Sequence, residues 1–127
     1  MGVWGIYNFQ NVNFSEYSLV RNLILNKLEI VNASKPHNHN DFLEFKVESI
    51  HYSFEDEIKE LYDRLDEYIN YCNFSDDNMI IIKALFNGVD VDEIARIKNV
   101  GSQTIYNRLR RIVLKINNVY ENKERES

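Results

Sequence analysis

The sequence predicts an all-α fold, with an N-terminal helix, a long acidic helix and a C-terminal pair of helices. Three observations support this prediction. Apolar residues recur at steps of three and four along most of the chain, which is the period of one helix face. The 127 residues include only four Gly and one Pro, so few positions interrupt a helix. Hydrophobic residues make up 44% of the chain, which favours a folded domain with a real core.

The first predicted helix covers residues 15–33. Ser15 is a suitable N-cap, because a serine hydroxyl can accept a hydrogen bond from a backbone N–H of the first turn. The apolar residues that follow at helical spacing are Tyr17, Val20, Ile24, Leu28 and Val31. Pro36 has no backbone N–H and ends the helix, and the polar residues 34–41 around it predict an exposed loop.

The second predicted helix is long and acidic and covers residues 41–72. Its apolar seam is spaced 4, 3, 4, 4, 3, 4, 3 and 4, close to a heptad repeat, and consists of Leu43, Val47, Ile50, Phe54, Ile58, Leu61, Leu65, Tyr68 and Cys72. Two explanations of the seam stay open. It could form a homodimer interface through residues 43–72, or it could pack on the first helix within one chain. Between residues 41 and 77, twelve acidic residues stand against three basic ones.

The third predicted helix begins at Ser75 and stops at Gly88. Ser75 is the expected N-cap, Asp76 and Asp77 suit the positive end of the helix dipole, and Gly88 can adopt the left-handed conformation that ends many helices. A short helix then begins at Asp90, where the Asp90-x-x-Glu93 pattern predicts a capping box. Its expected buried side consists of Ile94, Ala95 and Ile97.

The last predicted helix covers residues 102–116 and follows a tight turn. Asn99 and Gly101 in this turn are residue types that tolerate positive φ. The helix buries Ile105, Leu109, Ile112 and Ile116, at steps of 4, 3 and 4. A short helix, a tight turn and a longer helix form the plan of a helix-turn-helix motif. We therefore predict a DNA-binding domain over 75–120, preceded by a helical region over 1–74 and followed by a charged tail over 121–127.

Charge supports this prediction, because the chain has a net charge of −5 but its C-terminal region is basic. Residues 94–120 contain six Lys or Arg and no Asp or Glu. The residues expected to read bases in double-stranded DNA are Ser102, Gln103, Thr104, Tyr106, Asn107 and Arg108, whose types suit hydrogen bonding to base edges. The residues expected to contact phosphates are Arg96, Lys98, Arg110, Arg111 and Lys115.

Residues 74–116 resemble the region 4 helix-turn-helix of bacterial sigma factors. The matching positions are Gly88, Glu93, Ile94, Ala95, Val100, Thr104, Ile105, Leu109, Arg110 and Arg111. Asn99 stands where family members usually have Gly, and Gly101 where they usually have Ser or Thr. The layout of the whole chain is similar to phage regulators of late genes of the ArpU and RinA type. This second resemblance implies activation of phage genes at promoter DNA, with host RNA polymerase as a further partner.

Two other classes of function stay open. The acidic segment 41–77 favours a protein-interaction module that contacts RNA polymerase or another protein instead of DNA. A small terminase-like packaging subunit would also carry a helix-turn-helix and would assemble into rings. The aromatic residues near the N-terminus are expected to pack on the helices, or alternatively to dock on a partner subunit; they are Trp4, Tyr7, Phe9 and Phe14.

The remaining residues do not predict an enzyme, a cofactor or a metal site. The chain has no Ser–His–Asp or Cys–His arrangement and no glycine-rich phosphate loop. His37, His39 and Asp41 could approach a metal, but a His-x-His pair in an exposed loop is more often inert. One cysteine, no signal-peptide pattern and no apolar run of membrane-spanning length predict a cytoplasmic protein that does not enter a membrane.

Overall fold

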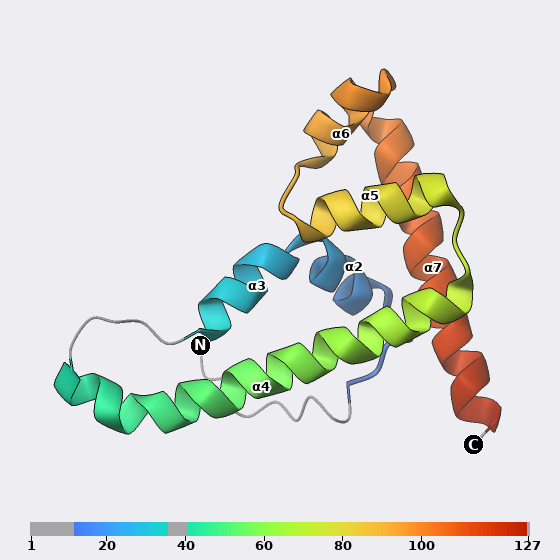
Figure 1. Cartoon of the computed structure of the whole chain (residues 1–127). Coiled ribbons are helices and arrows are strands. Elements are labelled where there is room, and N and C mark those ends of the chain that lie inside the picture. Colours follow the sequence, from blue (N-terminus) through green and yellow to red (C-terminus); the bar gives the residue numbers. More distant parts are fainter. Residues whose placement is uncertain (1–11, 36–40, 127) are drawn as a thin grey trace.

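A computed structural model describes residues 12–35 and 41–126 of the chain, with side chains for 12–35 and 54–125. Over these residues the protein is all-helical and contains no strand, which confirms the predicted fold class. The elements are α2 (Tyr17–Leu25), α3 (Lys27–Ser34), α4 (Asp41–Cys72), α5 (Asp76–Phe86), α6 (Val91–Lys98) and α7 (Ser102–Glu126). Figure 1 shows that the two long helices, α4 and α7, cross near the C-terminal end of α4, and that the shorter helices lie beside them.

The first predicted helix is two helices, because the chain bends at Asn26. The backbone of Asn26 has φ −119° and ψ 22°, outside the α-helical range, so α2 ends there and α3 begins. Ser15 is not the N-cap. Its hydroxyl donates to Asn13 Oδ1 at 2.6 Å, while Glu16 occupies the cap position without a side-chain capping bond. Local apolar spacing predicted both segments as helical but did not indicate the bend between them.

In the second half of α4, the apolar seam packs against other parts of the same chain. Ile58, Leu61, Leu65 and Cys72 are buried in the core, and Phe54 and Tyr68 pack partly buried against it. Helix α4 packs closely against α3 and α7. These seam residues therefore have an intramolecular role, as the packing explanation expected. The other seam residues, Leu43, Val47 and Ile50, lie outside the described side chains.

Phe14 joins the N-terminal segment to the two long helices. Its ring is buried, and its centroid lies 5.5 Å from that of Tyr68 in α4 and 5.7 Å from that of Tyr120 in α7. Asn117 of α7 is also buried, and its Nδ2 donates to the Phe14 carbonyl at 2.6 Å. Phe14 thus packs on the helices as expected, whereas Trp4, Tyr7 and Phe9 lie outside the described residues.

Helix α5 begins and ends as the sequence predicted. The Ser75 hydroxyl accepts a 3.2 Å hydrogen bond from the backbone N–H of Asn78, which satisfies one free donor of the first turn. Gly88 ends the helix with φ +85°. Its N–H donates to the Leu85 carbonyl at 3.0 Å, and the N–H of Val89 donates to the Ala84 carbonyl at 3.0 Å. This pair of bonds is a Schellman motif, which requires a left-handed residue such as Gly.

Helix α7 connects the C-terminal pair of helices to the rest of the protein. It packs against α6 and also against α2, α4 and α5. Its buried positions are Ile105, Leu109, Ile112, Val113, Ile116 and Asn117, which include all four of the predicted ones. The helix continues past residue 116 to Glu126, since its apolar face goes on with Val119 and Tyr120 packed against the core. One hydrophobic cluster includes residues from Val12 to Ile116.

None of the described helices combines the length and the apolar character that crossing a membrane would require. In the described part of the chain, no three His, Cys, Asp or Glu side chains gather in a way that could hold a metal ion. The candidate metal ligands predicted from the sequence, His37, His39 and the side chain of Asp41, lie outside this described part.

Candidate nucleic-acid interface

The candidate interface consists of α6, the turn 99–101 and the first half of α7. Helix α6 packs against α7 and buries Val91, Ile94 and Ala95. These positions form a stripe at i, i+3 and i+4, which faces the core. Ile97 was predicted to be buried, and this prediction is wrong, because its side chain is 67% exposed. The reason is geometric: Ile97 lies off the stripe, and the next position along it is Lys98.

The start of α6 also differs from the prediction. Asp90 occupies the N-cap position with φ −68° and ψ 152°, but its side chain makes no capping hydrogen bond. Glu93 does not reach back to close a capping box, since its carboxylate pairs with the guanidinium of Arg96, whose Nε lies 3.1 Å from Glu93 Oε1. The hydrogen bond that Glu93 accepts from Arg96 holds the pKa of this carboxyl below its usual value. One predicted phosphate contact is therefore already paired with an acid.

Asn99 makes the turn between α6 and α7. It adopts the left-handed conformation, with φ +59° and ψ 46°, which Asn tolerates better than most residues. The N–H of Val100 donates to the Ala95 carbonyl at 2.9 Å, and that of Asn99 to the Arg96 carbonyl at 3.2 Å. Asn99 thus serves as the left-handed residue of a second Schellman motif. Gly101 has no positive φ, and a Cβ atom there would meet no atom within 4 Å.

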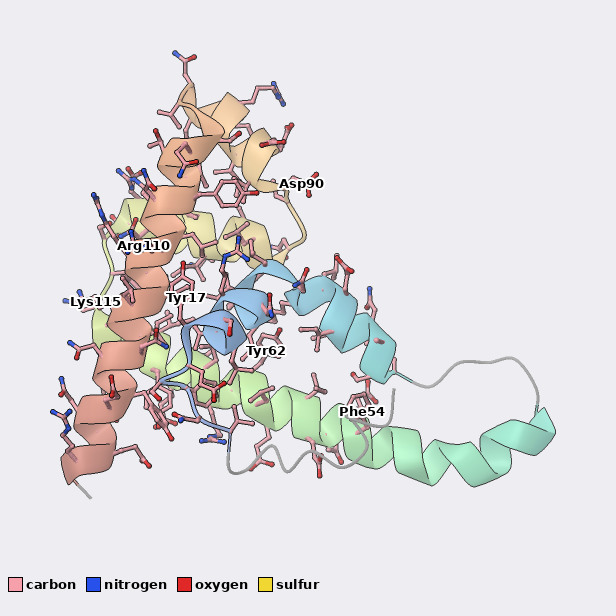
Figure 2. All side chains as sticks on the ribbon, turned by 180° about the vertical axis from the view of Figure 1, so that it is seen from behind. Tyr17, Phe54, Tyr62, Asp90, Arg110 and Lys115 are labelled. Atoms are coloured by element: carbon pink, nitrogen blue, oxygen red, sulfur yellow. The ribbon has the colours of Figure 1, made fainter. Side chains whose placement is uncertain are left out.

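An exposed row of side chains runs along the outer face of α7. Gln103, Asn107, Arg110 and Leu114 follow at steps of 4, 3 and 4, so they lie on one ridge of the helix. Gln103 Nε2 donates to Asn107 Oδ1 at 3.1 Å, which orients both amides along the ridge. Asn107, Arg110, Arg111 and Leu114 line a depression of about 420 Å³. Figure 2 shows Arg110 and Lys115 extending outward from α7.

Leu114 was not among the predicted site residues, although its side chain is 46% exposed on this ridge. Its spacing from Asn107 and Arg110 was a signal that could have found it, because a step of seven and a step of four share one helix face. Thr104 and Tyr106 flank the ridge and are also exposed. Four of the predicted base-reading residues are therefore exposed on α7, namely Gln103, Thr104, Tyr106 and Asn107. The other two, Ser102 and Arg108, are partly buried.

Arg108 and Lys98 face the start of α5 and share one carboxylate. Lys98 Nζ lies 3.1 Å from Asp77 Oδ1, and Arg108 Nη1 lies 3.4 Å from Asp77 Oδ2. Arg108 Nη1 also donates to Asn78 Oδ1 at 3.2 Å. The hydrogen bond and the charge of Lys98, and to a lesser extent Arg108, hold the pKa of Asp77 below its usual value. Ser102 is similarly engaged, since its hydroxyl donates to Asp92 Oδ1 at 2.6 Å.

The candidate cations therefore fall into two groups. Arg96 and Lys98 of α6 and Arg108 of α7 pair with carboxylates. Arg110, Arg111 and Lys115 are exposed and have no ion pair with any residue in the described part of the chain. Lys115 Nζ lies 5.4 Å from the centroid of the Phe74 ring, a cation–π distance that leaves its charge available. Among the candidate cations, those without an acidic partner in the described part of the chain therefore all lie on α7.

The reactive groups buried in the core have pKa values that keep them neutral near pH 7. Burial raises the pKa of the Cys72 thiol to about 11 and raises the pKa of the Tyr62 hydroxyl. A thiol must be deprotonated to act as a nucleophile, so Cys72 is poorly suited to that role. The chemistry offered by the exposed face of α7 is different: it combines amides, hydroxyls and guanidinium groups, which bind by hydrogen bonds and charge.

Comparison of the chain with protein-family models, with curated proteins and with solved structures finds no match. The resemblance of residues 74–116 to sigma region 4 stays a prediction from the residues themselves.

Proposed function

We propose that the protein is a sequence-specific transcription regulator that binds double-stranded DNA, and that it is encoded by a phage. In this proposal α6, the turn 99–101 and α7 act as a helix-turn-helix, and the first half of α7 enters the major groove. The observation that supports it most is the outer face of α7. This face presents amides and unpaired cations together, and α7 contains no acidic residue before Glu121.

Base reading is assigned to the exposed side chains near the start of α7. Asn and Gln can bond bidentately to adenine, and a Thr methyl can contact the thymine methyl. Gln103 and Asn107 are bonded to each other, so their amides are partly oriented before DNA arrives. That order lowers the entropy lost on binding. Ser102, Thr104, Tyr106 and Arg108 complete the proposed base-reading set.

Phosphate binding is assigned to the cations on both sides of this set. Arg110, Arg111 and Lys115 are open to DNA, whereas Arg96 and Lys98 must leave or share their acidic partners. Each phosphate that a cation neutralises releases counterions, which makes binding salt-dependent. The proposal thus predicts strong binding at low salt and a steep loss of affinity as salt rises.

Selection of bound sequences from random DNA, followed by binding measurements on the selected duplex, tests the proposal. Arg110→Ala should weaken binding, and the matched control Lys59→Ala should not, because Lys59 is an exposed cation on α4, where it pairs with Asp63. If no sequence is enriched and no duplex binds at low salt, the protein does not bind DNA. A palindromic selected site would also indicate a dimer.

A protein-interaction module is the second candidate, and one observation favours it. Ile97 and Val100 are both exposed apolar residues, three positions apart at the end of α6 and in the turn, and grouped exposed apolar side chains are a feature of protein-interaction surfaces. RNA polymerase or another protein would then contact this element in place of DNA, or in addition to it. Mass in solution separates both candidates from a small terminase-like subunit, which would form a ring, and it also tests the homodimer through residues 43–72.

A further inference from the structure

Asp77 brings a negative charge to the proposed DNA-binding face from a distant part of the sequence. It lies in the first turn of α5, and its two carboxylate oxygens contact Lys98 of α6 and Arg108 of α7, at 3.1 and 3.4 Å. Both of these cations belong to the set proposed to contact DNA. A single acid therefore neutralises part of the charge that α6 and α7 would offer to a phosphate.

Another anion can replace Asp77 as the partner of Lys98 and Arg108, because all three side chains are accessible to solvent. The side chain of Asp77 is 55% exposed, that of Lys98 25% and that of Arg108 38%. Ion pairs in such positions contribute little to stability and break easily. Arg108 uses only Nη1 in its contacts with Asp77 and Asn78 among the described residues, so its other N–H groups can face a second partner.

We propose that Asp77 competes with DNA for Lys98 and Arg108 and thereby limits the affinity of the protein for DNA of any sequence. The proposal rests on the proposed function, since it assumes that α6 and α7 meet DNA. A phosphate that approaches Lys98 must displace the Asp77 carboxylate or bind beside its negative charge. Either way fewer favourable contacts form, and non-specific binding consists almost entirely of such phosphate contacts.

A limit on non-specific affinity has a clear use for a sequence-specific protein. A genome offers a vast excess of non-specific sites, so occupancy of the correct site depends on how weakly the others bind. Of the proposed base-reading residues, Arg108 contacts Asp77, whereas the amide contacts of Gln103 and Asn107 do not involve this acid. Asp77 therefore weakens non-specific binding, which consists of phosphate contacts, proportionally more than sequence-specific binding.

Binding of a mixed-sequence DNA duplex by Asp77→Asn and Asp76→Asn tests the proposal. Asp76 is the matched control, because it is the neighbouring exposed acid of the same turn and has no ion pair with any described residue. Both substitutions remove one negative charge. Affinity is measured by fluorescence anisotropy between about 50 and 200 mM salt, a range over which phosphate contacts are strongly weakened.

Asp77→Asn should bind the duplex more tightly than the wild-type protein and should steepen the plot of log affinity against log salt by about 0.9, the value for one added phosphate contact. This slope corresponds to an additional affinity loss of about 3.5-fold between about 50 and 200 mM salt. Asp76→Asn should give a smaller gain and an unchanged slope. In a Lys98→Met/Arg108→Met background, the gain from Asp77→Asn should fall to that of Asp76→Asn.

A gain from Asp77→Asn that equals that of Asp76→Asn, or no gain, overturns the proposal, as does a gain that persists without the two cations. These outcomes differ from a failure of the proposed function. In that case the wild-type protein and every variant would fail to bind any duplex at low salt.

Discussion

The hydroxyl of Tyr62 in α4 donates a 2.6 Å hydrogen bond to the backbone carbonyl of Leu23 in α2. Leu23 lies in the last turn of α2, where carbonyl groups lack a partner within the helix. The bond therefore satisfies a buried acceptor next to the bend at Asn26. It also links α4 to the helix that packs on α7, so it supports the scaffold that holds the candidate interface.

Tyr62→Phe should lower the free energy of unfolding by about 1–3 kcal/mol, because it leaves the Leu23 carbonyl buried without a donor. Denaturant unfolding followed by circular dichroism measures this change. Tyr71→Phe is the control, since Tyr71 is exposed and the substitution removes the same hydroxyl. Equal effects of the two substitutions would show that the Tyr62 bond does not stabilise the fold.

Alkaline pH should destabilise the protein partly through the same residue. Burial raises the pKa of the Tyr62 hydroxyl above its ordinary value of 10.0. A group whose pKa is raised on folding contributes stability that is present below the unfolded value and is lost as pH rises above it. The free energy of unfolding should therefore fall above pH 10 in the wild-type protein and fall less in Tyr62→Phe. Parallel pH profiles would contradict this assignment.

Gly88→Ala should destabilise the protein by about 1–2 kcal/mol, the cost of a left-handed conformation for a residue with a Cβ atom. The φ of Gly88 is +85°, and an added Cβ would lie 2.8 Å from Leu28 Cδ2. Gly101→Ala is the control, because that position has no positive φ and no atom within 4 Å. Thermal unfolding should separate the two variants, and a similar melting temperature for both would contradict the role of Gly88.

Lys98→Met should raise the pKa of the Asp77 carboxyl toward its usual value. Lys98 is the main cause of the lowered pKa, through its hydrogen bond and its charge, and Arg108 is a smaller one. A carboxyl carbon-13 titration by NMR measures the change, and Arg108→Met should raise the pKa less than Lys98→Met. If neither substitution moves the pKa, the three side chains do not interact in solution. This measurement does not depend on DNA.

Asn107→Ala and Lys115→Ala should affect DNA binding in different ways. Asn107→Ala should reduce discrimination between bases, by about 1–3 kcal/mol if Asn107 makes a bidentate contact. Lys115→Ala should weaken all sequences alike and flatten the salt dependence by about one unit of slope. Binding of the selected duplex and its single-base variants measures both effects. A uniform loss for Asn107→Ala would place this residue among the phosphate contacts instead.

The sequence predicted the features that depend on neighbouring residues. Ser75 and Gly88 are confirmed as the cap and the stop of α5, since both act through hydrogen bonds within one turn. Asn99 takes the positive φ that its residue type tolerates. The buried positions of α7 are confirmed because helical periodicity alone determines which residues share a face.

Other features depended on residues far apart in the sequence and could not be predicted from local patterns. The Leu23 carbonyl beside the bend at Asn26 accepts its hydrogen bond from Tyr62, which lies in α4. The carboxylate that pairs with Lys98 and Arg108 belongs to Asp77, which lies in α5. The count of charges over residues 94–120 missed this acid, because Asp77 lies outside that segment and reaches it only when α5 packs beside α6 and α7.

By itself, then, the sequence determined the all-helical fold class, where α5 begins and stops and how the chain turns at residues 99–101, because these depend on backbone hydrogen bonds and side-chain spacing over a few residues. Only the tertiary structure decided which cations of the candidate interface pair with the Asp77 carboxylate and which remain unpaired among the described residues. The physical reason is that burial and ion pairing depend on which helices pack together, and that packing joins side chains separated by tens of residues.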